Sequence, residues 1–441
     1  MQYSTFAAID IGSYDVILEI FEISKKQGIR SVDKICHRME LGKDTYTLGK
    51  IRPEMEEELC RVLADFVRIM EGYRVDDYRA AASSAISEAS NSLYVLGKIH
   101  QLTGLSVTVL SNSEQRFLSY KALAAMEDNF NKIIEKGTAI LDLDGGSFQI
   151  SLFDKDALVT TQNIRMGSLR IRERLAGIQS ETEHYEEMVE ELIWNEVSSF
   201  KKMYLKDRKI ENIMLIGDVF TDSVYQNIEE KTTKIISREN FNTWYEKIIR
   251  QSPMELAVKL GIPLENASLM YPSAVIYKCL IDMMGAEHIW IPGVHMTRGI
   301  AYEYAEQMKL LKGGHNFEND ILMAAKNIGK RYAVNRPHVQ NLEMTALAMF
   351  DATKKMHGMK ERERLLLQMA VMLHDVGKYI SFNNVADSSY NIIMSNEIIG
   401  LSHIEREMVA LIARYNTVTL PSYDELVMES SLSAEQYLTV S

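Results

Sequence analysis

The most constraining feature of this sequence is a strand–turn–strand pattern that occurs twice. Residues 6–21 read FAAIDIGSYDVILEIF, and residues 141–153 read LDLDGGSFQISLF. In each segment an apolar run reaches an aspartate, small residues follow, and a second alternating run begins. Such alternation is typical of half-buried strands, and Gly next to Ser is typical of the turn between them. The repetition predicts two similar lobes, each built on a β-hairpin and facing the other across a cleft.

The periodicity after each hairpin predicts how the two lobes continue. In the first lobe it indicates a helix at 53–72, strands at 78–83 and 106–110, and a helix at 112–127. In the second lobe it indicates a connector at 131–137, a hairpin at 139–153, helices around 181–203, a strand at 213–217 and helices through 239–285. Strands mixed with helices in both halves are typical of α/β folds.

From about residue 306 the pattern changes to helices alone. Apolar residues at helical spacing indicate helices at 317–334, 338–357, 361–379, 390–399 and 403–415. A chain of 441 residues is also too long for one hydrophobic core. We therefore predict an α/β lobe at 1–130, a second α/β lobe at 131–305, and an all-α domain at 306–441.

Composition and charge limit the classes of partner. The net charge is −12, from 49 basic and 61 acidic side chains, which weighs against broad nucleic-acid binding. A phosphate-rich ligand would therefore need a local basic patch, a divalent cation, or both. No apolar run is long enough to span a bilayer, so we expect no membrane association and a cytoplasmic location. The three cysteines are far apart, which predicts free thiols rather than disulfides or a zinc site.

The two turns have the composition of phosphate-binding turns. Small residues leave backbone N–H groups unobstructed, so each turn can cradle a phosphate. The candidate phosphate-binding residues in the turns are Gly12, Ser13, Gly145, Gly146 and Ser147. Asp10 and Asp142 precede the turns and can hold a hydrated Mg²⁺ that contacts phosphate oxygens. One such turn is more often a plain hairpin, but two copies in two lobes favour binding of a phosphoanhydride between them.

Other motifs follow the hairpins in a characteristic order. They are AASSAISEASN at 81–91, LSNSEQRFLSY at 110–120, RMGSLRIRE at 165–173, LENASLMYPSAVIY at 264–277, TRGIAYE at 297–303, HVQNLEMTALAMFD at 338–351 and LLLQMAVMLHDVGKYIS at 365–381. Together with the two hairpins, this order resembles the exopolyphosphatase / guanosine-pentaphosphate phosphatase family of the actin-like ATPase superfamily. The resemblance covers nearly the whole chain.

The resemblance implies a fold and an activity. The fold would be a two-lobed actin-like (ribonuclease H-like) ATPase fold followed by an all-α HD-like domain. The activity would be Mg²⁺-dependent hydrolysis of the terminal phosphoanhydride of inorganic polyphosphate, or of the 5′-γ-phosphate of guanosine pentaphosphate. No organic cofactor is expected. The partners would be polyphosphate or guanosine penta/tetraphosphate and a second copy of the chain in a homodimer.

Several positions depart from the family pattern where the attacking water should bind. The family has two adjacent glutamates where this chain has Glu114 and Gln115, and a glutamate where it has Gln149. An amide can orient water but cannot accept its proton, so these changes predict reduced activity. Asp144 replaces a glycine and would repel phosphate unless a metal intervenes. Arg165 and Arg170 are candidate phosphate contacts, with a solvated surface position as the alternative.

Glu114 has two interpretations. The Ser111-x-x-Glu114 spacing before a helical run predicts a capping box, in which the glutamate accepts from the backbone of the N-cap residue. Alternatively, Glu114 supplies the catalytic base that Gln115 lacks.

The helical domain carries a partial metal-binding pattern. His338, His374 and Asp375 match three positions at which HD-like domains hold metal ions. The His-rich segment that usually follows is replaced by NNVADSSY at 383–390, and no Asp-bearing helix follows Leu438. We therefore expect an incomplete metal site in a domain that is truncated or has lost its last helix. The alternative is that both histidines are satisfied by hydrogen bonds within the helical bundle.

Three functions remain open on these residues. The first is a phosphoanhydride hydrolase of reduced activity, with Glu114 or Gln115 positioning the water. The second is a non-catalytic sensor that binds polyphosphate or an alarmone in the cleft. The third places the chemistry in the HD-like domain.

Overall fold

The computed structural model describes residues 4–126, 130–155, 157–176, 185–206, 208–227, 234–311 and 315–441. The chain divides into two compact units. The first comprises Met1–Asp156 with Gln162–His315, and the second comprises Ala157–Thr161 with Asn316–Ser441. The first unit holds both α/β lobes, and the second is helical apart from its short strand segment.

The sheet of the first lobe has the order β3-β2-β1-β4-β5. Its strands are β1 Ser4–Ile11, β2 Asp15–Ser24, β3 Gly28–Arg38, β4 Asp77–Ala82 and β5 Val107–Val109. β1 pairs antiparallel with β2 and parallel with β4. The expected hairpin is therefore present, and β3 extends it to a three-stranded meander that the sequence pattern did not predict.

The second lobe repeats this arrangement. Its strands are β6 Thr138–Leu143, β7 Phe148–Asp154, β8 Ala157–Ile164, β9 Asn212–Ile216, β10 Ile235–Ser237 and β11 His288–Trp290. Their order is β10-β11-β9-β6-β7-β8, and β6 pairs antiparallel with β7 and parallel with β9. The run β8-β7-β6-β9-β11 thus matches β3-β2-β1-β4-β5, which is the duplication expected of an actin-like fold.

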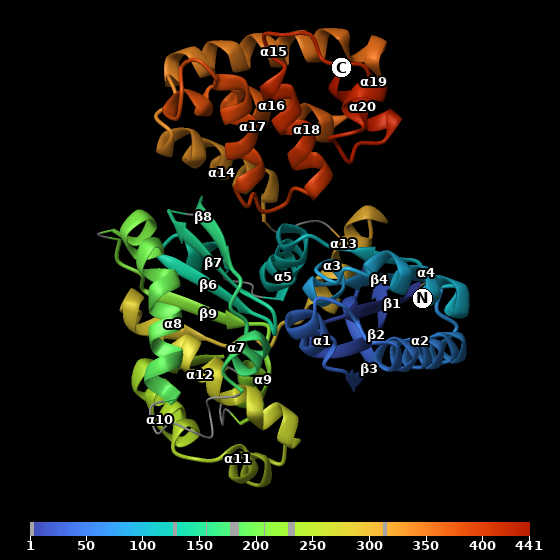
Figure 1. Cartoon of the computed structure of the whole chain (residues 1–441), viewed down its shortest axis with the longest axis vertical. Helices are drawn as coiled ribbons and strands as arrows, with labels where there is room; N and C mark the ends of the chain where they lie inside the picture. The colour runs from blue at the N-terminus through green and yellow to red at the C-terminus, as the bar shows by residue number, and fades with distance from the viewer. Residues whose placement is uncertain are drawn as a thin grey trace. The chain divides into compact units, whose positions relative to one another are not determined.

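Helices follow the strands in both lobes (Figure 1). The first lobe contains α1 Leu41–Leu48, α2 Pro53–Tyr73, α3 Ser84–Ser87, α4 Ser92–Thr103 and α5 Asn112–Met126. The second lobe is preceded by α6 Phe130–Ile134 and contains α7 Ser168–Leu175, α8 Tyr185–Phe200 with the π-helical turn Lys201–Leu205, α9 Val219–Asn227, α10 Arg238–Ile249, α11 Pro253–Leu260 and α12 Leu264–Met284. Of the helices expected around 181–203, residues 181–184 lie outside the described residues.

Helices cover both faces of the first sheet because its side chains alternate between them. Ile9 and Ile11 pack in one core cluster with Phe66 of α2. On the other face, Phe6 stacks on Tyr304 of α13 Met296–Gln307, with ring centroids 4.1 Å apart. α13 therefore belongs to the core of the first lobe, although the sequence pattern assigned residues up to 305 to the second.

The second unit is built from helices after residue 315. They are α14 Phe317–Arg331, α15 Arg336–His357, α16 Glu361–Leu373, the 3₁₀ turn Val376–Tyr379, α17 Val385–Ser395, α18 His403–Arg414, α19 Tyr423–Leu426 and α20 Ala434–Val440. The all-α prediction matches this unit, but its boundary lies at Asn316 rather than at 306.

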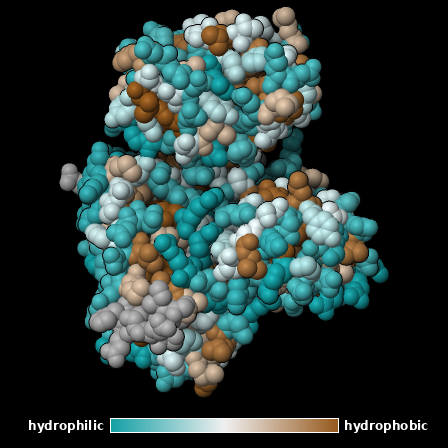
Figure 2. Space-filling view, viewed as in Figure 1, coloured by the Kyte–Doolittle hydropathy of each residue, from teal (hydrophilic) through white to brown (hydrophobic). Residues whose placement is uncertain are grey.

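The visible surface is mainly hydrophilic. Figure 2 shows hydrophilic residues over most of this face, with small groups of hydrophobic residues between them. None of the helices in the described part of the chain is long and apolar enough to cross a membrane.

Candidate functional site in the cleft between the lobes

Both hairpin turns line one cavity of about 410 Å³. Gly12 and Ser13 reach it from the β1–β2 turn, and Gly145 reaches it from the β6–β7 turn. Asp10 and Asp142 line the same cavity, near the carboxyl ends of β1 and β6. Because β1 and β6 occupy matching positions in the two sheets, the duplication brings both aspartates to one shared space.

Carboxylates dominate the charge of this cavity. Within the described residues, the aspartates that line it are Asp10, Asp15, Asp142, Asp144, Asp218 and Asp222. The basic groups are Lys34, Arg38, Arg116 and His295. Burial raises the pKa of Asp10 well above its ordinary value, and the nearby Asp15 and Asp144 raise it further. Burial also raises the pKa of Asp142, although the Arg116 guanidinium opposes this shift.

Arg116 on α5 is the main counter-charge to these carboxylates. Its side chain is buried, and Nη1 lies 2.8 Å from Asp142 Oδ1. Nη2 donates to Ser147 Oγ at 3.3 Å and lies 3.8 Å from Asp144 Oδ2. Arg116 thus ties the helix of one lobe to the hairpin of the other. This role of Arg116 was not predictable from the sequence, because only the fold shows that the residue faces the second hairpin.

The two amides occupy different places. Gln115 lines the cavity and donates through Nε2 to Asp144 Oδ2 at 3.2 Å. Gln149 is buried, is not among the residues that line the cavity, and donates to Ser151 Oγ at 3.3 Å. Gln115 is therefore placed to contact a water or ligand in the cleft, whereas the prediction that Gln149 does so is not supported by its position.

Glu114 forms the capping box. Its Oε2 accepts from the backbone N of Ser111 at 2.9 Å and from Ser111 Oγ at 2.7 Å. The backbone N of Glu114 is 3.3 Å from Ser111 Oγ, which completes the reciprocal pair. Glu114 is not among the cavity-lining residues. Its carboxylate therefore stabilises the start of α5, and its expected catalytic role loses support.

Part of the second turn is covered by the first lobe. Tyr46 Oη lies 2.7 Å from Ser13 Oγ and 2.9 Å from Ser84 Oγ. A Cβ atom added to Gly146 would collide with the Tyr46 hydroxyl and with Ser84 Oγ. Gly146 therefore serves a close approach between the lobes. Neither it nor Ser147, which accepts from Arg116, lines the cavity as the sequence analysis expected.

The two candidate phosphate-binding arginines lie outside the cavity. Arg165 is exposed. Arg170 donates through Nε to the carbonyl oxygen of Gly146 at 2.8 Å and pairs with Glu88 at 3.0 Å. Its guanidinium also lies over the Tyr46 ring, 3.8 Å from the centroid. Arg170 thus bridges the two lobes, and neither arginine is among the residues that line the cavity.

The family model described as the Ppx/GppA phosphatase family matches residues 20–308, more than half of the chain. The chain belongs to the Ppx/GppA phosphatase family. The model for domain III of Ppx/GppA phosphatases matches residues 322–438, within the helical unit.

Individual Ppx/GppA relatives are distant in sequence. A bifunctional 3-dehydroquinate synthase/phosphatase of Fusobacterium nucleatum is 21% identical over 64% of this chain, which spans 44% of that protein's length. A guanosine-5'-triphosphate,3'-diphosphate pyrophosphatase of Vibrio atlanticus is 19% identical to this chain. The match covers 99% of this chain and 85% of that protein's length. The crystal structure of an exopolyphosphatase from Cytophaga hutchinsonii matches with a TM-score of 0.61 at 17% identity, covering 69% of this chain and 98% of that one. At this identity the structural match shows the fold alone.

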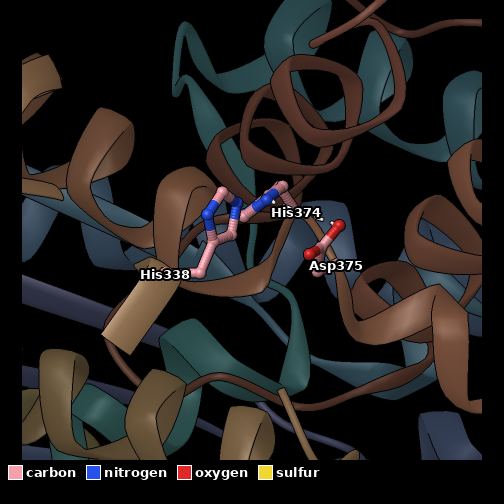
Figure 3. A group of neighbouring side chains, drawn as sticks. All are labelled: His338, His374 and Asp375. Atoms are coloured by element: carbon pink, nitrogen blue, oxygen red, sulfur yellow. Dashed lines mark ion pairs between the residues drawn. The ribbon is translucent and has the colours of Figure 1, made fainter. Parts of the chain in front are cut away.

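The helical unit of this Ppx/GppA protein brings together the three residues that were expected to be metal ligands. The ligand atoms of His338, His374 and Asp375 lie within 4.8 Å of one another (Figure 3). All three line a cavity of about 710 Å³ within the helical unit. An incomplete site was expected from the sequence, and its three expected ligands form one group.

Asp218 is a cleft residue of this family member that the sequence analysis missed. It follows β9 and lines the same cavity as Asp142. Its Oδ1 accepts from the backbone N of Thr221 at 3.1 Å and from Tyr277 Oη at 3.3 Å. Burial raises the pKa of Asp218 to about 7, an effect that outweighs these hydrogen bonds.

The raised pKa of Asp218 predicts a specific pH dependence of stability. The folded state holds this proton more tightly than the unfolded chain, whose Asp titrates near pH 4. The free energy of unfolding should therefore fall as pH rises from about 4 to about 7. In Asp218→Asn this part of the fall should be absent, as measured by urea denaturation in EDTA at pH 5 and pH 8. Asp65→Asn, which changes an exposed aspartate, serves as the control. Parallel pH profiles of unfolding free energy for the wild type and Asp218→Asn would show that Asp218 does not have a raised pKa.

Proposed function

We propose that the cleft binds a chain of phosphates and hydrolyses its terminal phosphoanhydride slowly, with inorganic polyphosphate or guanosine pentaphosphate as the substrate. The observation that carries this proposal is the meeting of Asp10, Asp142 and both glycine turns at one cavity. The family and its named relatives support the class of reaction. Hydrolysis forms a bond from the water oxygen to the terminal phosphorus, breaks the bond to the bridging oxygen, and releases the water proton to solvent.

The acidic residues of the cavity fit Mg²⁺. Carboxylate oxygens are the ligands that Mg²⁺ prefers, and Asp10 and Asp142 would hold it. Asp10 Oδ1 is buried and, among the described residues, has no hydrogen-bond partner. A buried carboxylate without a partner is costly, and a bound cation would compensate it. When bound, Mg²⁺ would neutralise phosphate charge in a cavity whose own charge is otherwise repulsive.

We expect slow turnover because Gln115, the residue placed to contact the attacking water, is an amide. Gln115 can accept or donate a hydrogen bond and so orient a water, but it cannot take a proton at neutral pH. Glu114 is engaged by the capping box, and Gln149 does not line the cavity. A missing general base typically costs about 10²–10⁴-fold in rate. The backbone N of Gly12 already donates to the carbonyl oxygen of Asp15 at 2.8 Å, and that of Gly145 donates to Asp144 Oδ1. A phosphate oxygen in the cavity would therefore accept from the backbone N of Ser13, or would displace one of these two bonds.

The same observations favour a second candidate function, a sensor that binds without turnover. Glu114 is held in the capping box and Gln115 is an amide, so neither of these two residues offers a free carboxylate to the cavity. A sensor would retain Mg²⁺-dependent binding of polyphosphate or an alarmone. Calorimetry would then show binding in the absence of phosphate release.

Phosphate release with Mg²⁺, measured on polyphosphate and on guanosine pentaphosphate, tests both candidates. We expect slow release by the wild type and at least a tenfold loss in Asp10→Asn, since an amide is a poorer Mg²⁺ ligand than a carboxylate. Asp65→Asn, on the surface, should leave the rate unchanged. Binding without release would favour the sensor. If neither compound binds with Mg²⁺ present, both candidates are wrong.

A further inference from the structure

We propose that the helical unit binds one borderline divalent transition-metal ion, of the Zn²⁺ or Fe²⁺ class, through His338, His374 and Asp375. This site is independent of the acidic cleft and goes beyond the proposed phosphoanhydride hydrolysis. Two imidazoles and one carboxylate are a donor set that suits Zn²⁺ or Fe²⁺ and suits Mg²⁺ poorly. The three side chains offer ligand atoms within 4.8 Å of one another, close enough to converge on one ion after small rotations.

His374 is held in an orientation that favours metal binding. It follows the last residue of α16, and its Nδ1 lies 2.8 Å from the backbone carbonyl oxygen of Val371. A carbonyl oxygen can only accept, so the proton is on Nδ1 and Nε2 is left with its lone pair. Metal-binding histidines are commonly oriented by such a hydrogen bond from the other ring nitrogen. Nε2 lies 3.4 Å from Asp375 Oδ1, as Figure 3 indicates with a dashed line.

Asp375 is oriented in a similar way. Lys378 Nζ donates to Asp375 Oδ2 at 2.6 Å. Oδ1 therefore remains on the His374 side of the carboxylate. Two ligands of a tetrahedral ion with bonds of about 2.0–2.2 Å are roughly 3.4 Å apart, which is the separation seen between these two atoms. Lys378 thus acts as a positioning residue for the carboxylate.

His338 completes the group from a different helix. It lies in the first turn of α15, whose N-cap residue Asn335 accepts from the backbone N of His338 at 3.2 Å. Its ring centroid is 5.5 Å from that of His374. The residue is exposed, so core packing does not account for its place beside two buried polar side chains.

The group also faces space for a ligand. His338, His374, Asp375 and Lys378 all line the cavity of about 710 Å³, together with Asn416. Three protein ligands leave at least one position of a tetrahedral ion open. An oxyanion such as phosphate could occupy that position, because the Lys378 ammonium and the Asn416 amide supply further donors.

Metal titration of the full-length chain tests the site. Co²⁺ replaces Zn²⁺ in such sites and reports coordination by its visible absorption. We expect one equivalent of Zn²⁺ or Co²⁺ to bind tightly, and His338→Ala to weaken binding by at least about 100-fold, since even outer-shell changes cost about 10–100-fold. His338→Ala should fold normally because the side chain is exposed. His403→Ala, also exposed and in the same unit, is the matched control.

Two further variants separate the roles. Lys378→Met should weaken Co²⁺ binding by about tenfold, and Lys378→Arg should restore it, which a purely structural effect would not do.

Asp10→Asn should leave this Co²⁺ site unchanged even if it abolishes phosphate release, so the two proposals fail separately. Added inorganic phosphate should shift the Co²⁺ spectrum. Equal Co²⁺ affinity in the wild type and His338→Ala, or loss of the tight site in Asp10→Asn, would overturn the proposal.

Discussion

Gln115→Glu is expected to raise the rate of phosphate release by about 10²-fold or more, because it places a carboxylate beside the attacking water. Gln115 lines the cavity, and its side-chain amide already reaches Asp144 at 3.2 Å. The change is nearly isosteric, so the shape of the cavity should be kept, but the added negative charge should weaken substrate binding and raise KM. Initial rates with Mg²⁺ on polyphosphate and on guanosine pentaphosphate would measure the gain.

The new glutamate should also impose a pH dependence. It would lie next to the Asp144 carboxylate, and two such neighbours raise the pKa of one member of the pair. Since the base must be deprotonated, the rate should increase with pH through that raised pKa. Adding Asp144→Gly removes the repulsion and should shift the rise to lower pH.

A matched control comes from the other amide. Gln149→Glu makes the same chemical change at a buried position that does not line the cavity. It should therefore lower stability without raising the rate. If Gln149→Glu speeds phosphate release and Gln115→Glu does not, the assignment of Gln115 to the water site is wrong.

Arg116→Met is expected to lower the free energy of unfolding by about 3–5 kcal/mol, the range found when one partner of a buried ion pair is removed. Asp142 would lose its partner at 2.8 Å, and Ser147 would lose its donor. Burial already raises the pKa of Asp142, and loss of the guanidinium would raise it further. The destabilisation should thus be larger at pH 8 than at pH 5, because the charged carboxylate is the form left unpaired.

Urea denaturation followed by tryptophan fluorescence is a suitable measurement. The three tryptophans, Trp194, Trp244 and Trp290, all lie in the second lobe, whose hairpin Arg116 contacts. Arg68→Met removes an exposed ion pair on α2 and should cost at most about 1 kcal/mol. Arg116→Lys keeps the charge and should recover part of the loss. If Arg116→Met lowers the free energy of unfolding no more than Arg68→Met does, the ion pair between Arg116 and Asp142 does not stabilise the fold as proposed.

The overall fold was predictable because its signals are local. The apolar runs in 6–21 and 141–153 are local signals, and both hairpins formed as expected. Their strands are buried on both faces rather than half-buried, because helices cover both sides of the sheet. The change to helical spacing after residue 306 likewise predicted the all-α unit. The strands β3, β8, β10 and β11 were missed. β3 has mixed, largely exposed residues, so its pairing with β2 depends on a neighbour rather than on its own pattern.

The candidate site was predictable only in part. Asp10, Asp142, Gly12, Ser13 and Gly145 reach the cavity because the position of an aspartate at a strand end is a local property. Gly146 and Ser147 are in the same turn but are covered by Tyr46 and Arg116, which come from distant parts of the chain. Arg170 bonds to Gly146 and Glu88 through contacts that sequence spacing does not encode, whereas Arg165 is exposed, which was the stated alternative.

The sequence by itself determined the two hairpin lobes and the helical unit, since each depends on the pattern of neighbouring residues. The tertiary structure decided which side chains face the cleft: Gln115 but not Gln149, and Asp218 and Arg116 in addition to the expected aspartates. The physical reason is that burial and pairing depend on what the other lobe brings to each side chain. Charge compensation of Asp142 by Arg116 exists only after the fold has brought α5 and β6 together.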